Sequence, residues 1–112
     1  APNHVARITE LVNDGFYDGI IFHRVIPGFM AQTGDPTGTG MGGSGTNLDA
    51  EFTDYQYSEG TVGMARAMNP NSADSQFFIC FDLYAGKLLF DKVEHKFSIL
   101  KDLISVRLAC IL

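Results

Sequence analysis

The sequence predicts a mainly β domain in which one N-terminal helix is followed by short antiparallel strands. Three observations lead to this prediction. Apolar residues near the N-terminus recur at helical spacing, the later apolar runs are short and rich in β-branched and aromatic residues, and glycines and prolines separate those runs. With 112 residues and 46% hydrophobic content, the chain is long enough for one small domain with a modest core.

The first predicted element is a helix that ends near Asn13. Pro2 suits the first turn of a helix, since its missing N–H would have no partner there. Asn13-Asp14-Gly15 is typical of a helix end. Between these signals, one apolar stripe can face the core; it is formed by Val5, Ile8, Leu11 and Val12.

Four strands are predicted after the helix. Residues 20–26 are β-branched and almost continuously apolar, and residues 29–33 continue in extended structure after the Pro27-Gly28 interruption. Residues 34–46 are glycine-rich and are expected to form a loop. Two further strands are predicted at residues 61–67 and 75–81.

The C-terminal part of the chain follows a different pattern. All 12 glycines lie at or before Gly86, and all four lysines follow that residue. We therefore divide the chain into a core at residues 1–86 and a divergent segment at residues 87–112. A C-terminal helix packed on the core is predicted in this segment, because apolar residues recur there at helical spacing: Phe97, Leu100, Ile104, Leu108 and Ile111.

Composition excludes several classes of function. The net charge of −5 and the pI near 4.9 argue against nucleic-acid binding, which needs clustered Lys and Arg. The apolar run at residues 108–112 is too short to cross a bilayer, which takes about 20 residues. Cys80 and Cys110 have no metal-ligand spacing, and Cys80 is interpreted as a small buried hydrophobe. We expect a cytosolic protein without membrane association, and without a metal or a cofactor.

Residues 22–35 are the most informative segment for function. Arg24 lies in an otherwise apolar run, and its guanidinium cannot lose its charge, so a half-buried Arg24 is expected to be directed at a ligand. Phe29, Met30 and Gln32 follow within eight residues and add two apolar surfaces and a neutral amide. This mixture suits an uncharged, ring-bearing ligand with a carbonyl group, and a proline-containing peptide fits that description.

Strand alternation predicts which of these residues share a face of a strand. Met30 and Gln32 share a face of one predicted strand, and Gln76 and Phe78 share a face of another. We expect the second pair on the exposed side, with Phe77, Ile79 and Phe81 in the core. Two strands then each offer an apolar surface beside a glutamine, as in a peptide-binding groove.

Three motifs carry a resemblance to a known family: FHRVIPGFMAQTGD at residues 22–35, GTVGMARA at 60–67 and SADSQFFICF at 72–81. With them the chain resembles the cyclophilin family of peptidyl-prolyl cis–trans isomerases, especially its bacterial members, from about Ala1 to Phe81. The resemblance implies a closed antiparallel β-barrel capped by helices. This barrel would be incomplete here, because an N-terminal hairpin and the last strand have no counterpart in the sequence.

The resemblance also implies a function and the residues that perform it. The chain is expected to accelerate rotation about Xaa-Pro bonds in peptides and in unfolded or partly folded proteins, and to bind cyclosporin-like cyclic peptides. By the same resemblance Arg24 is the catalytic arginine, Gln32 and Gln76 are orienting amides, and the proline ring lies against Phe29, Met30 and Phe78. The peptide backbone would lie along Ala65, Arg66 and Ala67.

Two alternatives to this function are a non-catalytic or inactive chain and a dinucleotide-binding protein. A proline-peptide-binding remnant without catalysis, or an inactive cyclophilin fragment, stays open because the sequence diverges after Phe81. Residues 38–43 match the G-x-G-x-x-G pattern of dinucleotide-binding loops, but no apolar helical stripe follows them, as such a loop requires. The glycines are expected to serve tight folding of the backbone instead.

Overall fold

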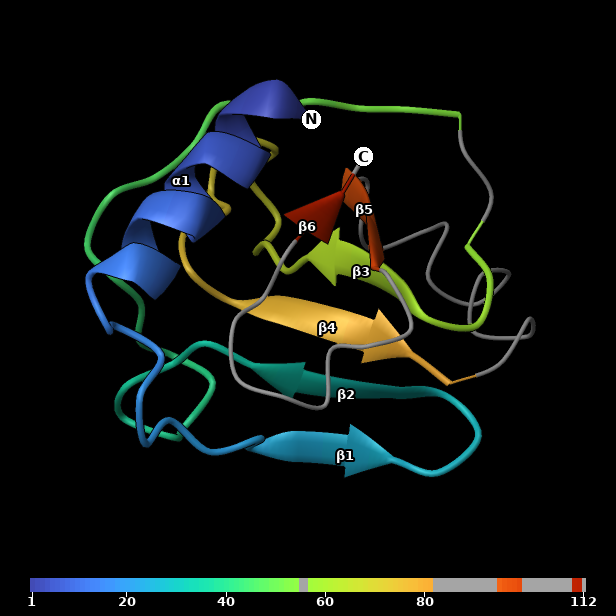
Figure 1. Cartoon of the computed structure of the whole chain (residues 1–112), viewed down its shortest axis with the longest axis horizontal. Coiled ribbons are helices and arrows are strands. Elements are labelled where there is room, and N and C mark those ends of the chain that lie inside the picture. The colour runs from blue at the N-terminus through green and yellow to red at the C-terminus, as the bar shows by residue number, and fades with distance from the viewer. Residues whose placement is uncertain (55–56, 82–94, 100–109, 112) are drawn as a thin grey trace.

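The computed structural model describes residues 1–54, 57–81, 95–99 and 110–111, and within them one helix precedes six strands. All strand pairs are antiparallel, and their order across the sheet is β1-β2-β4-β3-β5-β6. Figure 1 shows β1, β2 and β4 one above the next, with α1 at the upper left. The predicted mainly β fold with an N-terminal helix is confirmed. The elements are α1 (Pro2–Asn13), β1 (Arg24–Ile26), β2 (Met30–Thr33), β3 (Thr61–Met64), β4 (Phe77–Cys80), β5 (His95–Ile99) and β6 (Cys110–Ile111).

One face of the sheet packs against α1. The predicted apolar stripe of the helix is in place, since Ile8 and Leu11 are buried and Val5 and Val12 are partly buried. Burial of one such side chain contributes roughly 1.5–3 kcal/mol. The helix and the two central strands therefore form one core, whose buried members are Ile8, Val62, Met64, Ala73 and Phe77.

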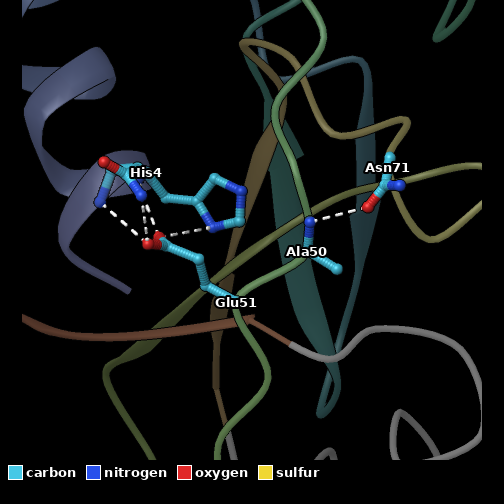
Figure 2. Close-up of polar contacts among 5 residues, drawn as sticks. His4, Ala50, Glu51 and Asn71 are labelled. Atoms are coloured by element: carbon cyan, nitrogen blue, oxygen red, sulfur yellow. Dashed lines mark hydrogen bonds and ion pairs between the residues drawn. The ribbon is translucent and has the colours of Figure 1, made fainter.

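The start of α1 is held by a carboxylate from a distant loop. Glu51 accepts hydrogen bonds from the backbone N–H of Asn3 (3.1 Å) and of His4 (3.0 Å), and from the Asn3 side-chain amide (2.8 Å). Figure 2 shows the Glu51 carboxylate facing this first turn, next to Ala50, whose N–H donates to Asn71. Burial raises the pKa of Glu51, but the donors from His4 and Asn3 outweigh it and lower the pKa. Glu51 therefore acts like an N-cap side chain, because it accepts hydrogen bonds from helix N–H groups that have no partner within the helix.

The first strand is shorter than predicted. The sequence indicated residues 20–26, whereas β1 contains only Arg24–Ile26, and Ile21 is 61% exposed. The reason lies in its partner, because Gly34, with φ of 95°, turns the chain away directly after β2. In the register of β1 and β2, residues 20–22 would lie opposite residues 34–36, beyond the end of β2 at Thr33.

The two later strands are also trimmed, and one predicted core residue is wrong. Strand β3 ends at Met64 rather than Ala67, and β4 contains Phe77–Cys80 rather than residues 75–81. Phe81 was expected in the core, but it is 42% exposed, because the chain has already left β4 at that point.

The predicted C-terminal helix is wrong where the structure describes the tail. Residues 95–99 form β5, which pairs with β3, and residues 110–111 form β6, which pairs with β5. Helical spacing of apolar residues could not reveal that β3 offers an edge to which this segment pairs. The remainder of residues 87–112 and the predicted boundary at residue 86 lie outside the described residues. Among the described residues, the strands pair in order from β1 to β6, and β1 does not pair with β6. The helix in that part of the chain is not long and apolar enough to cross a membrane.

Asp35 organises the glycine-rich loop after β2. Its carboxylate is 1% exposed and accepts hydrogen bonds from the backbone N–H groups of Thr37, Thr39, Gly40 and Gly42. Burial raises the pKa of Asp35, but the hydrogen bonds from Gly42, Thr37 and Gly40 outweigh it, so the pKa lies well below the usual range. A Cβ atom at Gly42 would collide with this carboxylate, which explains a glycine at that position.

We expect Glu51→Ala to lower the free energy of unfolding by about 1–2 kcal/mol, because the first turn of α1 loses its acceptor. Urea denaturation followed by circular dichroism measures this. The matched control is Glu10→Ala, which removes a carboxylate that is 58% exposed and pairs with Arg7 on the helix surface. Its effect should stay within about 0.5 kcal/mol, and equal losses in the two variants would contradict the capping role.

We expect Asp35→Asn to lower the melting temperature by about 5 °C or more, because an amide cannot accept as many hydrogen bonds as the carboxylate. The difference should be largest above about pH 5, where the carboxylate is ionised in both the folded and the unfolded chain. As the pH falls below about 4, the unfolded chain gains a proton before the folded chain does, so the advantage of Asp35 shrinks. Melting curves of both proteins from pH 7 to pH 3 test this, and a constant difference would refute it.

Candidate peptide-binding groove

Arg24 stands at the edge of the sheet. On β1 it lies opposite Gln32 of β2, and β2 is the only strand beside β1 in the part of the chain that the structure describes. The sequence led us to expect a half-buried guanidinium, but Arg24 is exposed, because β1 has no further strand beside it among the described residues. Within that part of the chain, no hydrogen bond or ion pair involves its side chain. The guanidinium is thus hydrated and accessible to a ligand.

Gln32, which lies opposite Arg24, is bonded to a second glutamine, Gln76. Gln32 Nε2 donates to Gln76 Oε1 at 2.9 Å, although these residues are 44 positions apart in the sequence. Gln76 Nε2 in turn donates to the carbonyl oxygens of Gly40 (2.9 Å) and Gly42 (2.8 Å). The structure therefore brings the two predicted amides together. It also gives Gln76 a link to the glycine-rich loop that the sequence did not indicate.

The predicted apolar residues gather on the same face of the sheet as Arg24. Gln32 lies opposite Phe78, and Met30 lies opposite Cys80, so these side chains follow one another across β2 and β4. Phe78 was expected on the exposed side, but it is 1% exposed, as is Met30. The reason is Tyr57, which the sequence analysis missed and whose ring lies 5.8 Å from that of Phe78.

Phe29 completes this apolar cluster from the turn between β1 and β2. It is partly buried and packs, together with Ile26 and Ala65, against the buried residues of the cluster. Phe29 is the most accessible of the three predicted ring-pocket residues. The cluster therefore presents Phe29 at its surface and keeps Met30 and Phe78 beneath it.

A cavity of about 480 Å³ is lined by both glutamines. The predicted backbone strip of Ala65, Arg66 and Ala67 also lines it, as does the glycine-rich loop. Arg24, Phe29, Met30 and Phe78 do not line it. Besides the loop glycines, four lining residues were not predicted from the sequence, which are Met41, Asn47, Ser72 and Asp74.

The charged residues of this cavity are engaged with the protein itself. Asp74 accepts hydrogen bonds from the N–H of Ser44 (3.1 Å) and of Gly45 (2.8 Å), as well as from the Ser44 hydroxyl. Arg66 Nη1 donates to the carbonyl oxygens of Ala67 (2.8 Å) and Met68 (3.2 Å). Both side chains therefore shape the walls of the cavity.

The same geometry argues against the dinucleotide interpretation of residues 38–43. Asp35 already accepts the N–H groups of Gly40 and Gly42, so these donors do not point at a phosphate. No helix begins after this loop in the stretches that the structure describes. The glycines instead form a wall of the cavity.

Comparison with known proteins agrees with this picture. Residues 1–109 match the family described as cyclophilin type peptidyl-prolyl cis-trans isomerase/CLD. A probable peptidyl-prolyl cis-trans isomerase of Brucella abortus is 55% identical over an alignment of 94 residues, which covers 73% of this chain and 48% of the relative. A peptidyl-prolyl cis-trans isomerase of Synechococcus elongatus is 54% identical over 82 residues, covering 73% of this chain and 56% of the relative. The chain thus spans about half the length of these curated relatives.

Solved structures give the same answer. A cyclophilin-type isomerase of Cryptosporidium parvum, determined in the presence of the dipeptide Ala-Pro, superposes with a TM-score of 0.79 at 29% identity, covering 98% of this chain and 82% of that one. The cyclophilin AquaCyp293 of Hirschia baltica superposes with a TM-score of 0.64 at 26% identity, covering 86% of this chain and 55% of that one. The chain belongs to the cyclophilin-type peptidyl-prolyl cis-trans isomerase family.

Proposed function

We propose that this chain accelerates cis–trans rotation about Xaa-Pro peptide bonds. The observation that carries the proposal is the strand register, which aligns Arg24, Gln32 and Phe78 in one row across three neighbouring strands. A cation, an amide and an aromatic ring thus share one face of the sheet. Membership in the isomerase family supports the same reaction.

The reaction needs a donor but no covalent step. Rotation about an amide costs about 18–20 kcal/mol, because the nitrogen lone pair is delocalised into the carbonyl. Xaa-Pro bonds populate both isomers, yet they interconvert over tens to hundreds of seconds. A donor directed at the prolyl nitrogen favours the pyramidal, single-bonded geometry and so stabilises the twisted state selectively.

We assign this donor role to Arg24. Its guanidinium stays charged at any physiological pH, and no protein group competes for it within the described residues. In the free chain it is hydrated, and a bound peptide would displace that water and strengthen the hydrogen bond. Exposure in the free state is therefore compatible with a catalytic role.

We assign the remaining predicted residues to binding. Phe29 would contact the proline ring, and Met30 and Phe78 would form the buried floor beneath it. Gln32 would orient the peptide through the part of its amide not bonded to Gln76. The backbone of the peptide would lie along Ala65, Arg66 and Ala67, which form a wall of the adjoining cavity.

Proline-containing peptides and unfolded or partly folded proteins are the proposed substrates. The Cryptosporidium parvum structure determined in the presence of Ala-Pro supports a proline ligand. A cyclosporin-like cyclic peptide is a proposed further ligand, which competition with a substrate peptide would test. We also propose a cytosolic location, which cell fractionation would test.

We expect Arg24→Ala to lower kcat/KM for a short Ala-Pro peptide by about 10²–10³-fold, because it removes a donor that acts in the transition state. Exchange spectroscopy by NMR measures the rate without any coupled enzyme. Arg24→Lys should recover only part of the loss, since an ammonium lacks the planar fork of donors.

Val25→Ala is the matched control for this experiment. Val25 is the neighbour of Arg24 on β1, is 55% exposed and points to the opposite face of the sheet. Its rate should equal that of the wild type. Unchanged exchange in Arg24→Ala would overturn the assignment, and peptide binding without any faster exchange in the wild type would favour a non-catalytic binding domain instead.

A further inference from the structure

We propose that Arg7 of α1 is a positioning residue for the groove, which holds the glycine-rich loop in the shape that a bound peptide needs without touching the peptide itself. This inference rests on the proposed function, because it concerns how the same groove keeps its shape before a peptide binds. Arg7 lies outside the three motifs found in the sequence, and it does not line the cavity.

The first support is the carboxylate of Asp74, which joins the glycine-rich loop to the segment before β4. Its Oδ1 accepts hydrogen bonds from the N–H of Ser44 (3.1 Å) and from the Ser44 hydroxyl, and its Oδ2 accepts from the N–H of Gly45 (2.8 Å). A Cβ atom at Gly43 would collide with the same carboxylate, so the loop backbone packs directly against it. Because Gly43, Gly45 and Asp74 all line the cavity, the shape of the cavity depends on this junction.

The second support is the hydrogen bond by which Arg7 reaches this junction from α1. Arg7 Nη2 donates to Ser44 Oγ at 3.0 Å, across 37 positions of the sequence. A guanidinium is only a donor, so the Ser44 hydroxyl accepts from Arg7 and uses its single hydrogen for Asp74. Arg7 therefore fixes the direction of that hydroxyl, and the hydrogen bonds run in one sense from α1 to the lining of the cavity.

The third support is that the surroundings of Arg7 offer little stability in return. Its Nε is buried and makes no hydrogen bond within the described residues, and a buried donor without a partner costs stability. Nη1 pairs with Glu10 at 2.7 Å, but Glu10 is 58% exposed, and such a surface pair contributes little. What Arg7 adds is order in the loop, and a loop that is ordered before binding loses less conformational freedom when a peptide binds.

The test compares a short peptide, acetyl-Ala-Pro-amide, with a longer one, acetyl-Ala-Ala-Ala-Pro-Phe-amide, in NMR exchange measurements. Arg7→Met keeps the apolar length of the side chain and removes its donors. We expect KM for the longer peptide to rise by about threefold to tenfold, with kcat unchanged. The kcat/KM for the short peptide should stay unchanged as well, because that peptide has too few residues to extend from the proline-ring site into the cavity.

A double-mutant cycle separates positioning through Ser44 from a general loss of stability. Ser44→Ala should raise KM for the longer peptide as Arg7→Met does, and adding Arg7→Met to Ser44→Ala should then change KM by less than about twofold. Glu10→Ala is the matched control, because it removes the other partner of Arg7 and leaves the bond to Ser44. It should leave KM unchanged, and thermal melting checks that each variant is folded.

Three outcomes would overturn the inference. They are an unchanged KM for the longer peptide in Arg7→Met, an equal loss with both peptides, and the full effect of Arg7→Met in the Ser44→Ala background.

The failure of the proposed function is distinguishable from the failure of this inference. If the wild type accelerated neither peptide, the isomerase proposal would fail, and the wild type and Arg7→Met would then be compared without turnover. Amide hydrogen exchange at Ser44 and Gly45 should be about threefold or more faster in Arg7→Met, with exchange at Gly42, which donates to Asp35, unchanged. This change together with a higher Kd for the longer peptide in calorimetry would support the inference, and either one left unchanged would overturn it.

Discussion

The groove depends on one chain of amide hydrogen bonds. Gln32 donates to Gln76, and Gln76 donates to the carbonyl groups of Gly40 and Gly42. These hydrogen bonds join strand β2, on which Gln32 lies opposite Arg24 of β1, to the glycine-rich loop that lines the cavity. Because a partly buried amide that lacks its partners is costly, the loop and the sheet constrain each other's position. The two halves of the groove are thus mechanically one unit.

Asp35 also fixes the shape of the glycine-rich loop, through the hydrogen bonds that its carboxylate accepts. A carboxylate can accept several hydrogen bonds, and here one carboxylate collects four backbone N–H groups that would otherwise need partners. Gly40 and Gly42 are therefore each held twice, because the N–H donates to Asp35 and the carbonyl group accepts from Gln76. Because Gly40, Gly42 and Gly43 carry no side chains, their part of the cavity wall leaves space that a peptide side chain can enter.

Much of this structure could be predicted from the sequence, and the successes share a cause. Periodicity of apolar residues depends on local geometry, so α1 and the existence of β2, β3 and β4 followed from residue spacing alone. The two glutamines and the residues around Phe29 followed from strand alternation and from motifs that resemble the cyclophilins. The roles of these residues remain predictions, since they concern a ligand.

What the sequence missed depends on contacts between distant segments. Nothing near Phe78 shows that Tyr57 covers it, and nothing near Glu51 shows that it caps a helix 47 residues away. The prediction of a C-terminal helix was wrong for the same reason. A period of 3.6 in residues 97–111 is a local signal, whereas the pairing of β5 with β3 depends on an available strand edge. The exposure of Arg24 also follows from topology, because among the described residues β1 has a neighbouring strand on one side alone. Long-range pairing, and not local preference, therefore fixes both the limits of the sheet and the environment of the residue on which the proposed chemistry depends.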